Sequence, residues 1–453
     1  MTQTEALTIL KTGANVFLTG EPGSGKSYTI NEYVRYLRGH DVEPAITAST
    51  GIAATHIGGL TIHSWSGIGI HTSLAMQDIR RIASSKYIGK RMRETKVLII
   101  DEVSMLAPAT LAMVEAVCRE ARQSYEPFGG LQIILVGDFF QLPPIIKRKT
   151  EDDPDQVVLL DEPEGRFAYD SSAWTRAHPV TCYLTEQHRQ DDQDYLGILS
   201  AIRDNTFSMK HVGHLENRRT TYDRVPNEAP KLFSHNVDVD LVNKDMLSQL
   251  PGELVEFPMR SYGPPPLVAT LKKGCLSPEF LNLKVGASVM FTKNNPRGGF
   301  VNGTLGIVEG FREDDNYPMI RTRHSRLVTA EPMDWAIEEG GMSKATITQM
   351  PLRLAWAITV HKSQGMSLDE AVMDLSEVFE YGQGYMALSR VRRLSGVHLI
   401  GWNQRAFQVH PEVITKDKEF HTESEATEKE YKKISPKIIA ERHEFFIKMC
   451  LEK

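Results

Sequence analysis

Eight consecutive residues, Gly20-Glu21-Pro22-Gly23-Ser24-Gly25-Lys26-Ser27, have the spacing of a phosphate-binding loop, GxxxxGK[ST]. They follow an apolar run, Val16 to Thr19, and precede a helical pattern from Tyr28 to Leu37, which is the context that such a loop requires. Glycines let main-chain N–H groups turn towards phosphate oxygens, and the following helix adds its dipole. We expect Lys26 to reach the β and γ phosphates and Ser27 to ligate Mg²⁺. The residues expected to contact the nucleotide here are Gly23, Ser24, Gly25, Lys26, Ser27 and Tyr28.

An acidic pair, Asp101-Glu102, ends a second apolar run, Leu98-Ile99-Ile100. Downstream of a phosphate loop, such a pair predicts that Asp101 holds Mg²⁺ and that Glu102 orients and deprotonates the attacking water. An acidic pair after a strand can also be a simple helix cap, but the loop upstream favours the catalytic interpretation.

A third polar segment, Gly137 to Pro144, follows the apolar run Ile133 to Val136. It would place the amide of Gln141 where it can sense the γ phosphate; the alternative is a rigid Pro-Pro turn at a strand end. Together the three segments predict a nucleoside triphosphatase, without saying what its energy drives.

Two arginines further along the chain have the setting of groups that complete such a site from a second lobe: Arg189 in Glu186-Gln187-His188-Arg189-Gln190, and Arg390 in Ala387-Leu388-Ser389-Arg390. An arginine of this kind stabilises charge developing on the γ phosphate, and its withdrawal couples hydrolysis to lobe movement. The alternative for each lone arginine is a surface ion pair.

The elements that must position these residues can be predicted from hydrophobic patterning. The apolar runs Val16–Leu18, Val97–Ile100 and Ile133–Val136 lack polar alternation, which is typical of strands buried on both faces of a parallel sheet. Ligands bind at the C-terminal ends of such strands, so we expect the three polar segments to lie together at one edge of the sheet in an α/β fold. A buried helix face is predicted by apolar residues at helical spacing, Leu111, Val114, Cys118 and Ala121.

Length and composition predict a multi-domain globular protein. Of 453 residues, 41% are hydrophobic and 24% charged, and no run approaches the roughly 18 apolar residues of a membrane span. The four cysteines stand far apart, which predicts core thiols and argues against a zinc site or disulfides. The first residues lack the features of a signal or transit peptide, so we expect a cytoplasmic protein, nucleoid-associated in a prokaryote. A net charge of -6 leaves any DNA contact to a local groove.

Further segments resemble, in the same order, those of the superfamily 1B helicases. They are Ala48 to Ala54 with Thr61 to Ser64, then Phe128 to Pro144, then Trp356 to Gly365, and the likeness runs from Gln3 to about residue 402. The chain most resembles the PIF-type (petite integration frequency) enzymes, with RecD and the phage Dda helicase more distant. The resemblance implies a motor with two RecA-like P-loop lobes, ATP and Mg²⁺ as cofactors, and single-stranded DNA as its track.

The resemblance also implies roles for individual residues. Gln3 matches the family glutamine that reads the adenine edge, which would select ATP over GTP, while Gly365 and Gln383 fall in motifs that line the nucleotide cleft. Movement from 5′ to 3′ is implied in the same way. At Asn236 the segment Phe233-Ser234-His235-Asn236 departs from the commoner Thr-Asn pair. The residues expected to contact the DNA strand are Thr50, Gly51, Thr61 and His63 from the first lobe, and Asn236, His361 and Ser363 from the second.

We expect the first RecA-like lobe at 1–190, with a short basic insert at about 64–92, and the second at 191–258 and 349–409. Residues 259–348, rich in turns and β-type runs, are expected to form an inserted SH3-like β domain. The short insert is either a DNA-contacting subdomain or a solvated helix pair. The tail, 410–453, is charged and partly helical, and we expect a solvated appendage. Trp65 and Trp356 are either base-stacking platforms or, more commonly for tryptophan, core residues.

The sequence therefore predicts an ATP-dependent DNA helicase of replication, recombination and repair that moves 5′ to 3′ on single-stranded DNA and unwinds duplex or structured DNA at single-strand/duplex junctions. We expect a monomer with no membrane partner, working beside single-strand-binding or replication and repair proteins. A P-loop switch or kinase is one alternative, but it has no use for His361 to Gly365 or Arg390. A strand-stimulated translocase that remodels protein–DNA complexes without efficient unwinding is the other.

Overall fold

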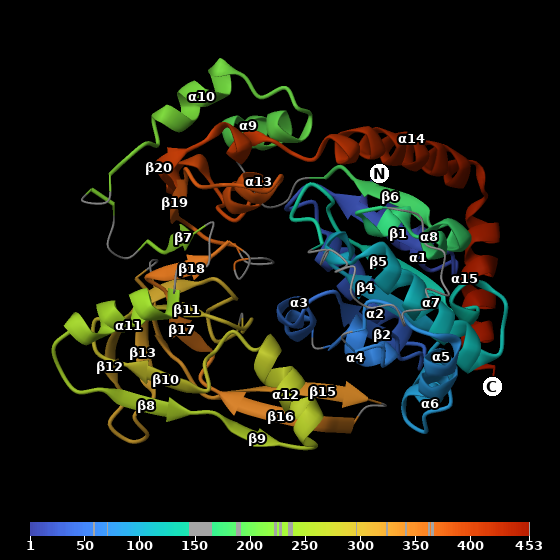
Figure 1. Ribbon diagram of the computed structural model, residues 1–453, viewed down its shortest axis with the longest axis horizontal. Helices are drawn as coiled ribbons and strands as arrows, with labels where there is room; N and C mark the ends of the chain where they lie inside the picture. Colours follow the sequence, from blue (N-terminus) through green and yellow to red (C-terminus); the bar gives the residue numbers. More distant parts are fainter. Residues whose placement is uncertain are drawn as a thin grey trace, which may run out of the picture. The chain divides into compact units, whose positions relative to one another are not determined.

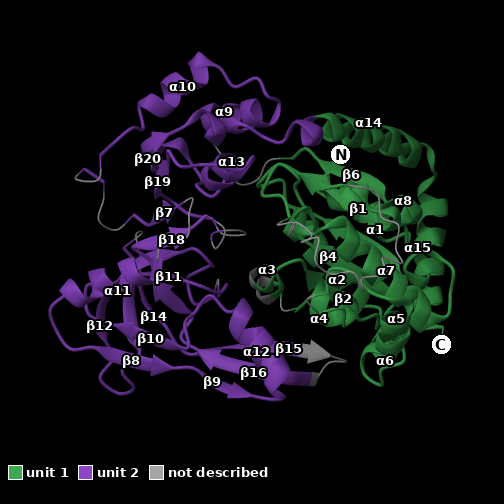
Figure 2. Ribbon diagram, in the orientation of Figure 1, with its two compact units in different colours: residues 1–189, 415–453 green, residues 190–414 purple. Residues whose placement is uncertain are grey.

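In the computed structural model, internal contacts divide the chain into two units (Figure 2). Unit 1 comprises residues 1–189 and 415–453, and unit 2 comprises residues 190–414. The residues that the structure describes are 1–57, 59–69, 71–144, 165–186, 192–221, 224–225, 229–233, 239–295, 297–322, 325–339, 342–360, 363 and 367–452.

Unit 1 is built on a six-stranded parallel sheet with the order β3-β2-β4-β5-β1-β6 (Figure 1). The strands β1 and β5 are buried along their whole length, and β4 up to its last residue, as expected of central strands covered on both faces. The predicted α/β class and the three predicted buried strands are confirmed. The strand bounds are β1 Val16–Gly20, β2 Ala45–Ala48, β3 Leu60–Thr61, β4 Val97–Asp101, β5 Gln132–Val136 and β6 Val180–Leu184.

The helices of unit 1 follow the strand ends or connect them. Helix α7 begins with Pro108 in its first turn, where the missing N–H costs no hydrogen bond, and it buries the predicted apolar face. In the short insert, α5 and α6 form a helix pair, and both contact α7. The helix bounds are α1 Gln3–Leu10, α2 Lys26–Arg38, α3 Gly51–His56, α4 Ile62–Ser66, α5 Met76–Ala83, α6 Ile88–Glu94, α7 Pro108–Arg122 and α8 Ser172–Ala177, with 3-10 turns η1 Val103–Met105, η2 Pro127–Gly129 and η3 Ala168–Asp170.

The C-terminal residues correct one prediction, because they form helices packed on unit 1 and not a solvated appendage. These are α14 Pro411–Lys433 and α15 Pro436–Leu451 (Figure 1). Phe420 and Ser424, one turn apart on α14, are 4% and 3% exposed, and Phe446 of α15 lies against Gly13. The prediction was wrong because a narrow buried stripe on a mostly charged helix hardly alters its average composition.

Unit 2 has a small parallel sheet with the order β18-β7-β19-β20. Its strands are β7 Lys231–Phe233, β18 Ala357–Thr359, β19 Ala371–Leu375 and β20 Val397–Trp402. The helices of unit 2 are α9 Gln193–Arg203, α10 Met209–Glu216, α11 Val239–Gln249, α12 Pro265–Gly274 and α13 Gln383–Leu388, with 3-10 turns η5 Leu394–Gly396 and η6 Gln404–Phe407.

Three antiparallel sheets form the β-rich region of unit 2, in the orders β14-β13-β12-β11-β17, β15-β16-β9 and β10-β8. They extend beyond the predicted insert boundaries, since β8 pairs with β10 and β17 pairs with β11. The pattern of a strand does not specify its partner, which is why residues from 349 onward were predicted to belong to the parallel lobe. The strands are β8 Val255–Pro258, β9 Arg260–Tyr262, β10 Phe280–Leu283, β11 Ser288–Phe291, β12 Leu305–Phe311, β13 Pro318–Thr322, β14 Leu327–Thr329, β15 Met333–Glu339, β16 Met342–Gln349 and β17 Leu352–Leu354.

The cysteines and tryptophans mostly serve the core. Cys118, Cys182 and Cys450 are buried free thiols, as predicted, whereas Cys275 is half-buried. Trp65 and Trp356 are 3% and 7% exposed, so the core interpretation holds for both. Among the described helices, none combines the length and the apolar character needed to cross a membrane.

Candidate active site

The phosphate loop joins the end of β1 to the first turn of α2, as its sequence predicts. Gly23 and Gly25 both have φ of 90°, a conformation that glycine adopts at little cost. A Cβ at Gly25 would also lie 1.9 Å from Gln3 Nε2, so a larger residue there would displace the Gln3 side chain. Lys26 Nζ donates to the carbonyls of Gly20 at 2.7 Å and Glu21 at 3.1 Å, which holds the ammonium over the loop.

The acidic pair lies at the C-terminal end of β4. Asp101 Oδ1 accepts a hydrogen bond from the Glu102 N–H at 2.8 Å. Glu102 itself is left-handed, with φ of 53° and ψ of 43°, which for a residue with a side chain costs about 1–3 kcal/mol. Ser49, which follows β2, holds this turn: its Oγ donates to the Glu102 carbonyl at 2.7 Å, and its N–H donates to the Asp101 carbonyl at 3.1 Å.

The electrostatics of the acidic pair fit a cation and a triphosphate. Burial raises the pKa of the Asp101 carboxyl, while the Glu102 N–H and the charge of Lys26 oppose that rise. A carboxylate oxygen at Asp101 and the exposed hydroxyl of Ser27 are the hard oxygen ligands that Mg²⁺ prefers. Among the described residues, the buried Ser24 Oγ has no hydrogen-bond partner, which leaves a donor in the loop. The residues present therefore fit Mg²⁺ and ATP.

Gln141 is placed by the segment that follows β5. Its side chain is 7% exposed, and its Nε2 lies 3.5 Å from Asp138 Oδ2. Asp138 is 1% exposed and also accepts from the Phe140 N–H at 3.2 Å, so one buried carboxylate orders the turn. The three predicted segments thus follow β1, β4 and β5, strands of one sheet, and their polar residues meet at its C-terminal edge.

Gln3, expected at the adenine end, is held by hydrogen bonds with residues from distant parts of the sequence of unit 1. Its Nε2 donates to the Ser24 carbonyl at 3.1 Å, and its N–H donates to Glu186 at 2.8 Å. Glu5, two residues on, accepts from the Thr2 N–H at 2.8 Å and pairs with Lys432 of α14 at 3.1 Å. Partial burial raises the pKa of Glu5, but these hydrogen bonds and the lysine outweigh it, so the pKa lies below its ordinary value.

The strand-contact candidates of unit 1 lie in the segments around α3 and α4. Thr50 Oγ1 accepts from the Ala53 N–H at 3.2 Å, so it caps α3, which starts at Gly51. Thr61 Oγ1 accepts from the Ser64 N–H at 3.2 Å and caps α4 in the same way. His63 is half-buried, and burial lowers its pKa, which favours the neutral imidazole at physiological pH.

In unit 2 the structure describes three of the sequence-predicted residues, Ser363, Gln383 and Arg390. Gln383 is fully buried in the first turn of α13, and its Oε1 accepts from the Phe379 N–H at 3.4 Å. Ser363 is fully buried, and its Oγ donates to the Val360 carbonyl at 2.6 Å, so its hydroxyl stabilises its own turn. Arg390 is 3% exposed at the end of α13 and donates to the Met386 carbonyl at 3.1 Å. Four further candidates, Arg189, Asn236, His361 and Gly365, lie outside the described residues.

The short basic insert is partly used within the fold. Arg91 of α6 donates to the carbonyls of Ser64 and Trp65, and its guanidinium lies 5.9 Å from the Trp65 ring centre. These contacts of Arg91 with α4 support the interpretation of the insert as a helix pair.

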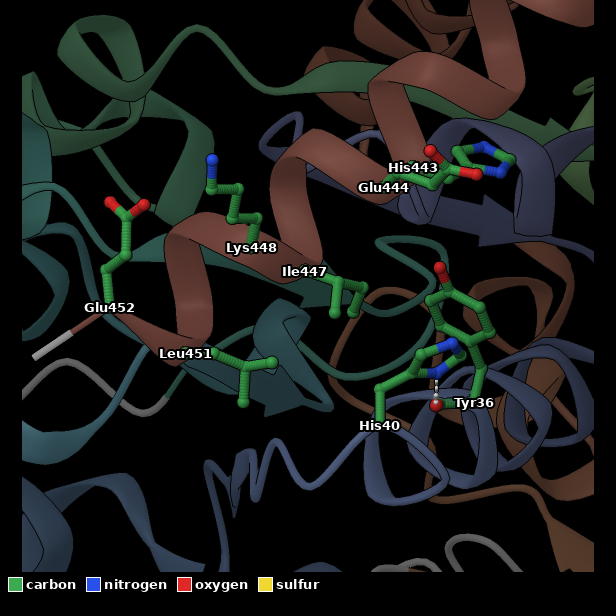
Figure 3. Close-up of a pocket in the computed structure, with 8 residues that line it drawn as sticks. All are labelled: Tyr36, His40, His443, Glu444, Ile447, Lys448, Leu451 and Glu452. Atoms are coloured by element: carbon green, nitrogen blue, oxygen red, sulfur yellow. Dashed lines mark hydrogen bonds between the residues drawn. The ribbon is translucent and has the colours of Figure 1, made fainter.

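A hollow of about 420 Å³ lies where α15 meets α2, but none of the predicted site residues lines it (Figure 3). Its lining includes aromatic, apolar and charged side chains of both helices and of the residues just after them. These are Tyr36, His40, His443, Glu444, Ile447, Lys448, Leu451 and Glu452.

Several residues that support the site were missed by sequence reasoning. Ser49, Asp138 and Glu186 contact predicted site residues directly, and Glu5 with Lys432 secures the helix that carries Gln3. Asp138 lies within the recognised segment Gly137 to Pro144 and could have been singled out. For Lys432 the sequence offers no signal, because a lysine on a charged helix is usually a solvated residue.

Comparison with known proteins agrees with this geometry. The family model described as PIF1-like helicase matches residues 3–206, and the model described as DNA helicase Pif1, 2B domain, matches residues 267–311. The ATP-dependent DNA helicase Pif1 of Psychrobacter sp. (strain PRwf-1) is 42% identical over 99% of this chain and 75% of its own length. That of Bdellovibrio bacteriovorus is 36% identical over 92% of this chain and 91% of its own length. For the Xenopus laevis PIF1 helicase, 36% identical, the chain spans 63% of the relative.

Solved structures agree as well. Bacteroides sp Pif1 in complex with ADP-AlF4 matches with a TM-score of 0.80 and 29% identity, over 93% of this chain and 96% of that one. Bacteroides Pif1 bound to single-stranded DNA matches with a TM-score of 0.63 and 30% identity, over 94% and 97% of the two chains. By identity, coverage and fold, the resemblance first indicated by the motifs is confirmed: the chain belongs to the PIF1-like helicase family.

Proposed function

We propose that this protein is an ATP-dependent DNA helicase that moves 5′ to 3′ along single-stranded DNA and unwinds duplex or structured DNA. The observation that carries the proposal is the meeting of the phosphate loop, the acidic pair and Gln141 at one edge of a parallel sheet, in a member of a helicase family. The relatives' names, ATP-dependent DNA helicase, supply the reaction.

We assign separate roles in ATP hydrolysis to residues of unit 1. Lys26, held over the loop by two carbonyls, exchanges them for the β and γ phosphates when ATP binds. Glu102, in its strained turn, orients and deprotonates the attacking water, and Gln141 senses the γ phosphate. Asp101 and Ser27 would hold Mg²⁺, which neutralises charge on the phosphates.

The remaining candidates act on the transition state or on the DNA. Arg189 and Arg390 are proposed to stabilise the charge that develops on the γ phosphate. Gly365 is proposed to line the nucleotide cleft. The proposed strand contacts are Thr50, Gly51, Thr61 and His63, with Asn236, His361 and Ser363.

Strand binding should be tolerant of sequence and should weaken with salt, because phosphate contacts dominate in such a groove. Single-stranded DNA and single-strand/duplex junctions are the proposed partners, and a solved relative, Bacteroides Pif1, is described as bound to single-stranded DNA. We propose a monomer that acts where chromosomal DNA lies, beside replication and repair proteins.

The test compares partial duplexes that carry only a 5′ or only a 3′ single-stranded tail, in the presence of ATP and Mg²⁺. We expect unwinding from the 5′ tail alone. Unwinding from the 3′ tail alone would overturn the proposed direction. Unwinding from neither, with ATPase activity still stimulated by single-stranded DNA, would favour a translocase that remodels protein–DNA complexes. An ATPase without stimulation by single-stranded DNA would refute the motor itself.

A further inference from the structure

Ser49 connects the proposed strand contact of unit 1 with its catalytic turn. It directly precedes Thr50 and Gly51, and it is 9% exposed. Its Oγ donates to the Glu102 carbonyl at 2.7 Å, and its N–H donates to the Asp101 carbonyl at 3.1 Å. We propose that Ser49 is a positioning residue that holds Glu102 in its catalytic conformation and transmits strand binding to ATP hydrolysis. The part of this inference that concerns strand binding rests on the proposed function.

The Glu102 turn depends on such support because its backbone is unfavourable by itself. With φ of 53° and ψ of 43°, Glu102 occupies a region that side chains rarely adopt, and neighbouring groups must stabilise it. On the far side the turn is packed against Gly137, where a Cβ would lie 3.1 Å from Val103 Cγ1 and 3.2 Å from Ser104 N. Glu102 is therefore held between the segment that carries Gln141 and the hydroxyl of Ser49.

The link from Ser49 towards the strand contact is short and ordered. Thr50 Oγ1 accepts from the Ala53 N–H at 3.2 Å, and the Thr50 carbonyl accepts from the Ala54 N–H at 2.9 Å. The first turn of α3 is thus tied to the residue next to Ser49. A displacement of this turn on strand binding would reach the Glu102 carbonyl through two consecutive residues, Thr50 and Ser49.

Thr47 provides a matched control on the same pair of strands. Its Oγ1 donates to the Ile99 carbonyl at 2.7 Å, so it also joins β2 to β4 by a buried hydroxyl. This bond lies within the strands and touches neither Glu102 nor Thr50. Loss of the Thr47 hydroxyl therefore tests a purely structural role for such a bond.

The experiment measures steady-state ATPase rates of the full chain with and without a single-stranded oligonucleotide, for wild type, Ser49→Ala, Ser49→Thr and Thr47→Val. We expect Ser49→Ala to lower the DNA-stimulated kcat about tenfold, because small misplacement of a catalytic group is costly. The KM for ATP should stay within about twofold, since binding groups are untouched. The ratio of stimulated to basal rate should fall, Ser49→Thr should restore it, and Thr47→Val should leave it unchanged.

A double-mutant cycle identifies the group through which Ser49 acts. If Ser49 works through Glu102, adding Ser49→Ala to Glu102→Gln slows turnover no further. Equal fractional losses of the basal and stimulated rates, or additive losses in the cycle, would overturn the inference. If the wild-type ATPase is not stimulated by DNA, the proposed motor fails and the transmission with it, whereas the cycle still decides whether Ser49 positions Glu102.

Discussion

The two ends of the proposed nucleotide site are built in different ways. At the phosphate end, Lys26, Glu102 and Gln141 each follow closely on a strand of one parallel sheet, so the chain itself delivers them to a common edge. At the adenine end, Gln3 depends on Glu186, 183 positions away in sequence, and its helix on Lys432 of the C-terminal helix α14. The residues proposed for phosphate chemistry therefore lie in strand-end motifs, whereas the residue proposed for base selection is positioned by packing around α1.

The largest expected effect is at the phosphate end. Lys26→Ala should lower kcat about 10³-fold or more, because the ammonium that stabilises the transferring phosphoryl group is lost. Steady-state ATPase assays measure this. Binding of single-stranded DNA should persist, since the proposed strand contacts are separate residues. Strand binding lost together with turnover would show that the two sites are not separable.

The next effect tests how far the C-terminal helix supports the sheet behind the site. Phe420 of α14 lies 4.8 Å from Phe17 and 6.1 Å from Phe139 between ring centres. Phe420→Ala should lower the free energy of unfolding of unit 1 by about 3–5 kcal/mol, because it leaves a cavity. Denaturant unfolding measures it. The control Phe445→Ala, at a side chain that is 64% exposed, should change that free energy by less than about 0.5 kcal/mol. A similar loss in both variants would contradict a specific role for α14 in stabilising the sheet.

A smaller effect is expected at the adenine end itself. Gln3→Ala should reduce the preference for ATP over GTP about tenfold, because the amide that reads the base edge is lost while the phosphate contacts remain. The measurement is kcat/KM for each nucleotide. Thr4→Ala, an exposed neighbour on α1, is the control. An unchanged ATP:GTP ratio in Gln3→Ala would mean that base selection lies elsewhere.

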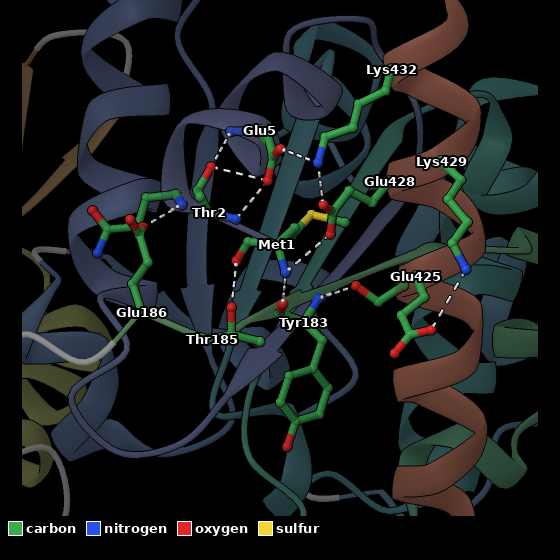
Figure 4. A network of polar contacts seen from close by, with 12 residues as sticks. Met1, Thr2, Glu5, Tyr183, Thr185, Glu186, Glu425, Glu428, Lys429 and Lys432 are labelled. Atoms are coloured by element: carbon green, nitrogen blue, oxygen red, sulfur yellow. Dashed lines mark hydrogen bonds and ion pairs between the residues drawn. The ribbon is translucent and has the colours of Figure 1, made fainter.

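The smallest expected effect is on the KM for ATP, and it tests whether Lys432 acts only at the adenine end. Lys432→Ala should raise the KM for ATP about twofold at low salt and leave kcat unchanged, since exposed ion pairs are weak and screened. Lys429, one turn earlier on α14, pairs with Glu425 at 3.8 Å, and among the described residues it has no ion pair with α1, so Lys429→Ala should have no effect (Figure 4). A drop in kcat, or an equal response from both lysines, would contradict a role confined to the adenine end.

Sequence patterns predicted the parts of the fold in which one short segment carries its own signal. The buried strands of unit 1, the face of α7 and the β-type runs of the insert were all predicted and are confirmed. The packing of α14 was predicted wrongly, because this mostly charged helix carries one phenylalanine, Phe420, and one tyrosine, Tyr431, which do not form a clear apolar stripe. Residues 352–354 were predicted to belong to the resumed lobe but pair with β11, because the sequence pattern of a strand does not determine its hydrogen-bond partner.

By itself, the sequence determined the phosphate-end residues and the order of the helicase motifs, since glycines, lysine and carboxylates at fixed spacing after apolar runs allow little else. Only the tertiary structure revealed that Ser49 hydrogen-bonds to the strained Glu102 turn and that Lys432 of the C-terminal helix α14 forms an ion pair with Glu5 of α1. These contacts join residues far apart in the chain, and each is a single hydrogen bond or ion pair of common residue types. Such pairs leave no periodic trace in a sequence; the folded chain alone brings them together.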